Sequence, residues 1–80
     1  MNSNKLKGLR VGRGYTQEKI SKKIGITTKT YNRKELGFVE FNCNEISKIA
    51  EILEMSLQSV NEIFFESKLT NRLTKDTRTA

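Results

Sequence analysis

The sequence predicts an all-α fold in one small domain, and three observations carry this prediction. Apolar residues recur at spacings of three and four along most of the chain, Ser, Thr and Asn precede these stretches as helix caps, and glycine follows several of them. A β-sandwich would need more turn residues and more alternation of β-branched residues than these 80 residues offer. A chain of this length is expected to form a single domain with a core of modest stability.

The first predicted helix spans residues 4–11, with Ser3 as its N-cap. Leu6 and Leu9 lie three residues apart and therefore share one face. Gly8 falls inside the helix, where glycine costs about 1 kcal/mol relative to alanine. The pattern predicts the helix in spite of this residue.

Two short helices follow, and the chain between them has a distinctive order. Thr16 is the cap of a helix over residues 17–24, which Gly25 closes. Two residues beyond that glycine, Thr27 caps a second helix over residues 28–36. Two short helices joined by a tight turn that contains glycine predict a helix-turn-helix.

The second half of the chain predicts two more helices. Asn42 or Asn44 caps a helix that runs to about Glu54, with an amphipathic stripe of apolar residues. Ser56 caps a fifth helix, whose inner face is expected to carry Leu57, Val60, Ile63 and Phe64. We expect one domain over residues 1–66 and a polar, basic and flexible tail over residues 67–80.

Composition excludes several classes of function. Histidine is absent and Cys43 is the single cysteine, so the chain can form neither a Cys–His catalytic pair nor a zinc site of the Cys/His type. We predict no enzyme activity, no metal, no cofactor and no small-molecule ligand. No apolar run is long enough to span a membrane or to act as a secretory signal, and the lack of a disulfide framework fits a reducing compartment. The expected location is the cytoplasm.

Charge is distributed unevenly along the chain. Residues 1–34 hold ten basic residues and one acid, whereas residues 35–66 hold one basic residue and seven acids. Residues 67–80 add four basic residues and one acid, which gives the net charge of +6. This segregation predicts one face for a polyanion and another face turned away from it.

These residues also stand in the order of a known family motif. The positions that carry the motif are Leu6, Leu9 and Arg10; Gly14 to Glu18; Ile20, Ile24, Gly25, Ile26 and Thr27; Tyr31, Glu35 and Gly37; and Ile49, Ala50, Leu53, Met55 to Leu57, Ile63 and Phe64. Over residues 5–65 the chain resembles the phage repressor/Cro-type helix-turn-helix domain, also called the xenobiotic response element family. The resemblance implies a compact five-helix, lambda-repressor-like DNA-binding domain.

The resemblance also implies how the helix over residues 28–36 would be used. In this family it is the recognition helix, which enters the major groove of DNA. Carried over by position, Thr28, Lys29 and Arg33 face the groove and Asn32 lies at its margin. These four residues are the expected base contacts. Tyr31 is expected to pack in the core rather than to stack on a base.

Contacts to the DNA backbone and one internal ion pair are implied in the same way. Gln17, Lys19 and Arg10 are the expected phosphate contacts, because helix N-termini and basic side chains attract phosphate. Gln17 is further expected to brace Thr28. Arg10 and Glu35 resemble the family's ion pair between the first helix and the end of the recognition helix.

The implied function is sequence-specific binding of double-stranded DNA by a transcriptional regulator. We expect a repressor that binds a palindromic operator as a homodimer, in a phage, mobile-element or other small bacterial regulatory circuit. Three departures from the family pattern are Ser21, at a position that is usually Ala, Lys34, at a position that is often a core aliphatic, and the apolar loop over residues 38–41, which is usually basic. The loop leaves open an alternative, in which the same fold serves as a protein-interaction module or an antitoxin.

Overall fold

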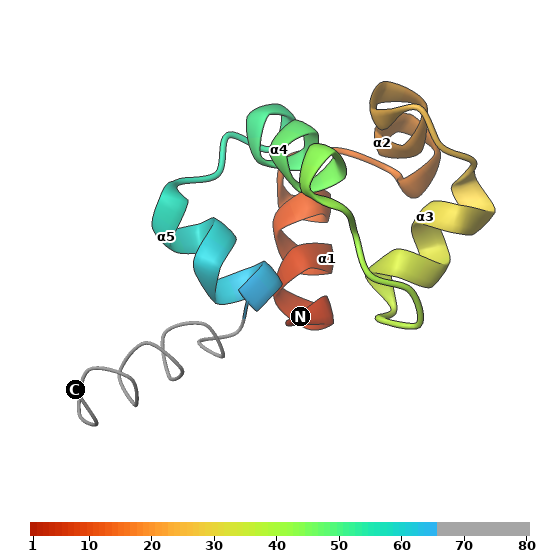
Figure 1. Cartoon of the computed structure of the whole chain (residues 1–80). Coiled ribbons are helices and arrows are strands. Elements are labelled where there is room, and N and C mark those ends of the chain that lie inside the picture. Colours follow the sequence, from red (N-terminus) through yellow and green to blue (C-terminus); the bar gives the residue numbers. More distant parts are fainter. Residues whose placement is uncertain (66–80) are drawn as a thin grey trace.

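A computed structural model describes residues 1–65 of the chain, and this part is entirely helical. These residues form five α-helices, the last of which continues as a π-helical segment, and Figure 1 shows their arrangement. Their bounds are α1 (Ser3–Gly12), α2 (Gln17–Ile24), α3 (Thr28–Glu35), α4 (Cys43–Ile52), α5 (Leu57–Val60) and η1 (Asn61–Phe65). The all-α, five-helix prediction is confirmed, whereas the predicted tail lies outside the described residues and the boundary at residue 66 stays a prediction.

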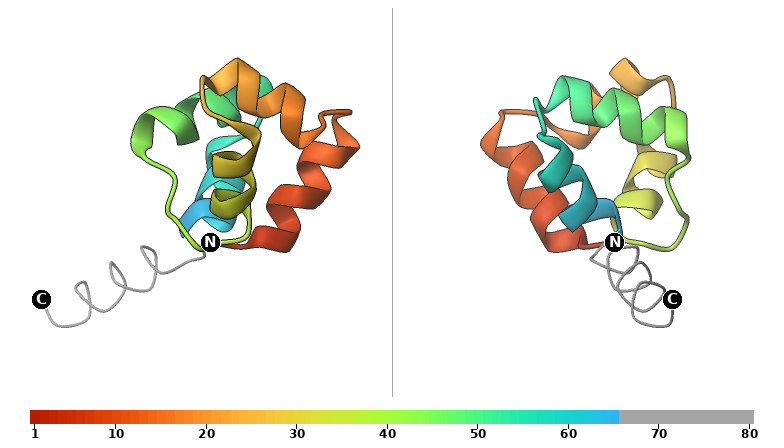
Figure 2. Two further views of the ribbon diagram at one scale, coloured as in Figure 1. Left: turned by 90° about the vertical axis from the view of Figure 1, so that its right-hand side faces the viewer. Right: turned by 60° about the vertical axis from the view of Figure 1, so that its left-hand side comes forward.

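The helices form two ends around a central helix. In Figure 1, α2 and α3 lie at one end of the molecule, α5 at the other, and α1 stands between them. In the right-hand view of Figure 2, α4 runs across the top of the molecule, above α5 and α3. The α2–α3 pair is therefore free to present a surface that α5 does not obstruct.

The first helix begins one residue earlier than predicted. Its N-cap is Asn2 rather than Ser3, because the Asn2 side chain accepts a 3.1 Å hydrogen bond from the backbone N–H of Lys5. The Asn2 N–H also donates to the carbonyl of Ile63 at 2.6 Å, which ties the start of the chain to η1. Asparagine and serine are about equally favoured as N-caps, so the sequence does not distinguish Asn2 from Ser3. The bond from Asn2 to Ile63 favours Asn2 as the cap.

The core joins residues from α1 to α4, from the loop that precedes α4 and from η1. Its fully or largely buried apolar members are Leu6, Ile20, Ile24, Tyr31, Phe41, Ile49, Leu53, Ile63 and Phe64. Three of them form an aromatic chain, in which the rings of Tyr31 and Phe64 each lie 5.7 Å from the ring of Phe41. The predicted core role of Tyr31 is confirmed, since its side chain is fully buried.

The last helical segment differs from its prediction. Ser56 is the cap, as expected, and Ile63 and Phe64 are buried. Leu57, however, is 85% exposed, so its expected place on the inner face is wrong. The α-helix ends after four residues and the chain continues as the π-helical η1, so the periodicity used for the prediction does not hold over this segment.

Candidate DNA interface

The turn between α2 and α3 fixes the angle of the two helices. Gly25 has φ +82° and caps α2, a left-handed conformation that glycine adopts without strain. The N–H groups of Gly25 and Ile26 both bond to the carbonyl of Ser21, at 2.9 and 3.0 Å. The buried Ser21 hydroxyl donates to the Glu18 carbonyl and lies 3.3 Å from the Thr28 hydroxyl, so this side chain contacts both helices. The predicted helix-turn-helix is confirmed.

One face of α3 is buried and the adjacent face is open. Tyr31 and Glu35 point into the molecule. The expected base contacts lie on the other side of the helix: Thr28, Lys29 and Arg33 are exposed and Asn32 is half-buried. Residues at these spacings share one helical surface, so a ligand on this face would meet all four.

A buried ion pair holds α3 to α1. Arg10 and Glu35 are 5% and 4% exposed, and Arg10 Nε lies 2.8 Å from Glu35 Oε2 while Nη2 lies 3.2 Å from Oε1. The expected ion pair between the two helices is therefore present. The Tyr31 hydroxyl donates to Glu35 Oε2 at 2.7 Å and adds a neutral partner to the pair.

The carboxyl of Glu35 is held as an anion. Burial alone would raise its pKa, but hydrogen bonds from Arg10, Tyr31 and Gln17 outweigh burial and leave the pKa below its usual range. The pKa of Tyr31 is raised, first by burial and then by its hydrogen bond to the Glu35 carboxylate. The Glu35 charge is thus a fixed feature of the site at neutral pH.

The expected phosphate contact by Arg10 is wrong. All three guanidinium nitrogens of Arg10 donate hydrogen bonds inside the protein. Nε and Nη2 bond to the Glu35 carboxylate, and Nη1 bonds to the Tyr15 carbonyl at 2.6 Å. A guanidinium so buried and so paired cannot reach a DNA backbone without breaking the ion pair. Arg10 is a structural residue of this interface.

Gln17 braces a different residue from the one expected. Its Nε2 donates to Asn32 Oδ1 at 3.1 Å and to Glu35 Oε1 at 3.0 Å. Thr28, the expected partner, instead lies against the Ser21 hydroxyl. An amide nitrogen has two hydrogens, so both donors of Gln17 are occupied and a phosphate would meet the main-chain N–H groups of the α2 N-terminus rather than this side chain.

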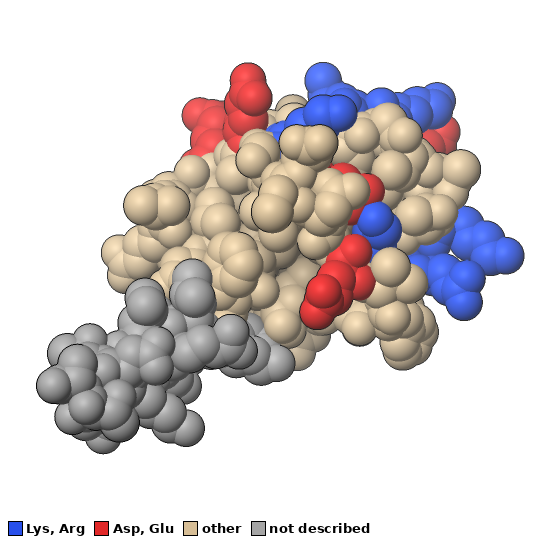
Figure 3. Space-filling model, viewed as in Figure 1, with Lys and Arg blue, Asp and Glu red and all other residues tan. Residues whose placement is uncertain are grey.

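Basic side chains surround the α2–α3 pair. Lys19, an expected phosphate contact, is exposed on α2 together with Lys22 and Lys23. Figure 3 shows Lys and Arg gathered over α2 and α3, while Glu lies mainly over α4 and the segments on either side of it. The uneven charge of the sequence thus becomes a basic end and a more acidic middle of the molecule.

Lys34 forms a second ion pair that the sequence prediction missed. Its Nζ lies 2.6 and 2.8 Å from the two carboxylate oxygens of Glu45, and both side chains are largely buried. Glu45 is also the third residue of a capping box with Asn42, which settles the alternative between Asn42 and Asn44. The Asn-x-x-Glu spacing could have indicated this cap from sequence, and with it an acid near the end of α3.

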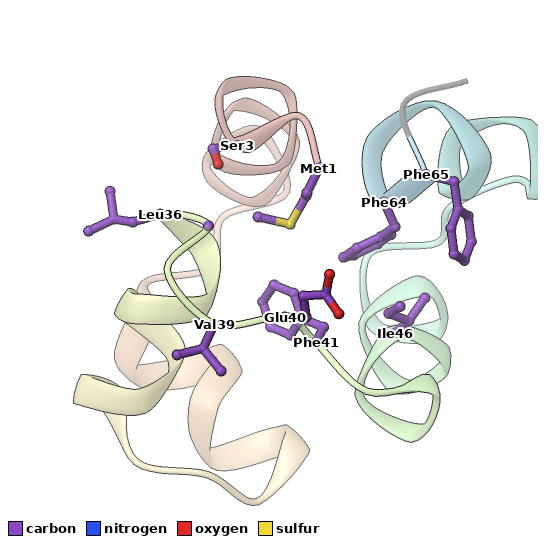
Figure 4. A pocket seen from close by; sticks show the side chains of 10 residues that line it. Met1, Ser3, Leu36, Val39, Glu40, Phe41, Ile46, Phe64 and Phe65 are labelled. Atoms are coloured by element: carbon purple, nitrogen blue, oxygen red, sulfur yellow. The ribbon is translucent and has the colours of Figure 1, made fainter. Parts of the chain in front are cut away.

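The loop after α3 is divided between core and surface. Phe41 is buried, but Leu36, Phe38 and Val39 are 54%, 76% and 46% exposed. A hollow of about 690 Å³ lies beside this loop, and Figure 4 shows Phe41, Phe64 and Met1 directed toward its middle. Cys43 is exposed at the start of α4.

The fold and the geometry of α2 and α3 define this chain as a helix-turn-helix protein. Residues 6–60 match the helix-turn-helix family of the Cro/C1 type. This match covers well over half of the chain, and the protein belongs to that family, whose members are DNA-binding transcriptional regulators. No curated protein and no solved structure gives a significant match. Within residues 1–65, no helix is long and apolar enough to cross a membrane.

Proposed function

We propose that this regulator is a sequence-specific repressor that binds a palindromic operator as a homodimer. The observation that carries the proposal is the open face of α3, where Thr28, Lys29, Asn32 and Arg33 lie side by side on a helix whose other face is fixed to the core. An α-helix fits the major groove, and arginine and lysine suit the acceptor edge of guanine. The exposed lysines of α2 supply candidate contacts to phosphates, with Lys19 foremost.

A homodimer is part of this proposal for a geometric reason. One recognition helix reads only a few base pairs, and two copies that grip half-sites about one helical turn apart double the contacts. Repression would follow from occupancy, because a dimer on an operator that overlaps a promoter excludes the polymerase. A phage, mobile-element or other small bacterial circuit is the proposed setting.

Selection from random DNA duplexes tests the proposal directly. The expected product is a palindrome, which reports sequence, symmetry and half-site spacing together. Binding to that product should weaken steeply as salt rises, because phosphate contacts release counterions. Sedimentation at increasing concentration should show a weak dimer, and a persistent monomer that binds a single half-site would contradict the homodimer.

One observation favours a second candidate, a protein-interaction module or an antitoxin on the same fold. The loop that follows α3 exposes Leu36, Phe38 and Val39, where basic residues would otherwise contact phosphate. Under this alternative the chain would not bind random DNA even at low salt. A gel shift over a salt series distinguishes the two candidates, because the first requires binding at low salt and the second predicts none.

A further inference from the structure

Asn32 ends a chain of hydrogen bonds that begins at a buried charge. Glu35 Oε1 accepts from Gln17 Nε2 at 3.0 Å, and the same nitrogen donates to Asn32 Oδ1 at 3.1 Å. Both hydrogen bonds join Gln17 at the start of α2 to a residue of α3. The chain therefore links the interior of the molecule to the open face of the recognition helix.

The Glu35 carboxylate can act only as an acceptor in this arrangement. Its Oε1 accepts from Arg10 and Gln17, and its Oε2 accepts from Arg10 and Tyr31. Both oxygens thus meet donors, and no proton is needed on the carboxyl. Any side chain that approaches Oε1 must present a hydrogen-bond donor.

This requirement fixes the orientation of two amides in turn. Gln17 must turn its NH₂ group toward Glu35, because its carbonyl oxygen would be repelled by the carboxylate. The second hydrogen of that NH₂ then meets Asn32, which must turn its oxygen inward to accept it. The remaining group of the Asn32 amide, its NH₂, is left to face outward.

We infer that Asn32 is a specificity-determining residue whose amide is locked by Gln17 and Glu35 so that it offers hydrogen-bond donors to the DNA base it meets. This inference rests on the proposed function, since it requires α3 to lie in the major groove. Gln17 acts here as a positioning residue, and its role is to prevent the Asn32 amide from turning over.

A fixed donor discriminates among bases in a predictable way. Guanine presents two acceptors in the major groove, N7 and O6, whereas cytosine presents only its N4 amino donor. Adenine N7 and thymine O4 each offer a single acceptor, so the position that Asn32 faces should favour guanine, which offers two, and should reject cytosine by about tenfold. A freely turning amide would tolerate either orientation of the base pair, because it could donate to one and accept from the other.

The experiment is selection from random duplexes with the full chain and two variants at this position. Asn32→Ala should lose preference at one symmetric pair of positions and keep the remainder of the motif. Asn32→Asp keeps the shape and the bond from Gln17 but turns an acceptor outward, so the same position should change from guanine to cytosine. Asn4→Asp is the matched control, because it makes the same substitution at an exposed residue of α1, outside the helix-turn-helix, and it should leave the motif unchanged.

Gln17→Met tests the positioning role separately. It keeps the length of the side chain and removes both donors, so the Asn32 amide becomes free to turn. The expected result is a relaxed preference between guanine and cytosine at the Asn32 position alone, with other positions retained. A role of Gln17 limited to stability would lower the melting temperature without altering that single position.

The outcomes separate this inference from the proposed function. A wild-type motif that is insensitive to Asn32→Ala, or that holds a base other than guanine at the position Asn32→Ala relaxes, would overturn the inference and leave sequence-specific binding intact. An Asn32→Asp variant that keeps guanine would overturn it as well. Failure of the wild-type protein to select any motif would overturn both.

Discussion

Arg33 and Glu35 stand two residues apart on α3 and experience opposite environments. The Arg33 side chain is exposed on the open face, whereas Glu35 is 4% exposed and accepts bonds from three residues. A charge in water is available to a ligand, and a buried charge must be paired to be tolerated. The same helix thus separates a candidate contact with DNA from a structural anchor.

Arg33→Ala is expected to weaken binding to the cognate operator by roughly 1–3 kcal/mol, because arginine grips guanine with two parallel hydrogen bonds. Binding to random DNA should fall by one screened phosphate contact at most. Arg33→Lys should restore the charge but not the full discrimination, since an ammonium lacks the planar geometry. Titrations on cognate and random duplexes check this, and equal losses on both would place Arg33 on the backbone.

Glu35→Gln should lower the free energy of unfolding by about 3–5 kcal/mol, because it leaves the buried Arg10 guanidinium without a counter-charge. Glu40→Gln is the matched control, since Glu40 is exposed, and it should change stability by less than about 0.5 kcal/mol. Urea unfolding of both variants measures the difference. Two similar midpoints would show that the pair contributes little beyond its own desolvation.

At the scale of the helices, backbone conformation and not crowding by neighbouring side chains decides whether Gly8 and Gly25 can be replaced. Gly8 lies inside α1 with open space around its Cα, whereas Gly25 caps α2 at φ +82° with equally open space. A methyl group therefore meets no obstacle at either position. The backbone conformation alone decides the sign of a substitution.

Gly8→Ala should stabilise the protein by about 0.5–1 kcal/mol, through better helix propensity and a less flexible unfolded chain. Gly25→Ala should destabilise it by about 1–2 kcal/mol, because an L-residue is strained in the left-handed region. Thermal unfolding of both variants measures the two changes in stability, and each variant serves as the control for the other. A destabilised Gly8→Ala would indicate that α1 needs a break at this residue.

At the scale of the whole molecule, two buried carboxylates make the free energy of unfolding depend on pH. Burial raises the pKa of Glu45, but hydrogen bonds from Lys34 and from the Asn42 backbone outweigh it, so the pKa is lowered, as it is for Glu35. Both groups bind a proton more readily in the unfolded chain than in the folded one. Their contribution is therefore present at neutral pH and is lost on acidification.

The midpoint of urea unfolding is expected to stay level above about pH 5 and to fall as the pH drops below the ordinary carboxylate range of about 4 to 4.5. In this pH range the carboxyls of Glu35 and Glu45 are protonated in the unfolded chain but stay ionised in the folded protein. Glu35→Gln should flatten part of this slope, since one of the two groups no longer titrates. An unchanged slope in that variant would assign the acid sensitivity to other carboxylates.

Local sequence patterns were sufficient for the elements that depend on neighbours in the chain. The caps Thr16, Thr27 and Ser56 and the closing residue Gly25 all lie where they were predicted, because a cap needs only a side chain and the N–H groups that follow it. The prediction failed at Leu57, because the helix changes its period at Asn61 and Leu57 therefore does not share the face of Ile63 and Phe64. It also missed the Lys34–Glu45 pair, because the two side chains meet only after α3 and α4 have packed.

The sequence by itself determined the five helices, the helix-turn-helix and the family, since these follow from spacing, caps and the order of a motif. Only the tertiary structure decided how the polar residues are used. Arg10 resembled a phosphate contact in sequence but is buried in an ion pair, and Gln17 braces Asn32 instead of Thr28. The physical reason is that hydrogen-bond partners depend on distances between helices, and residue spacing along one chain does not specify those distances.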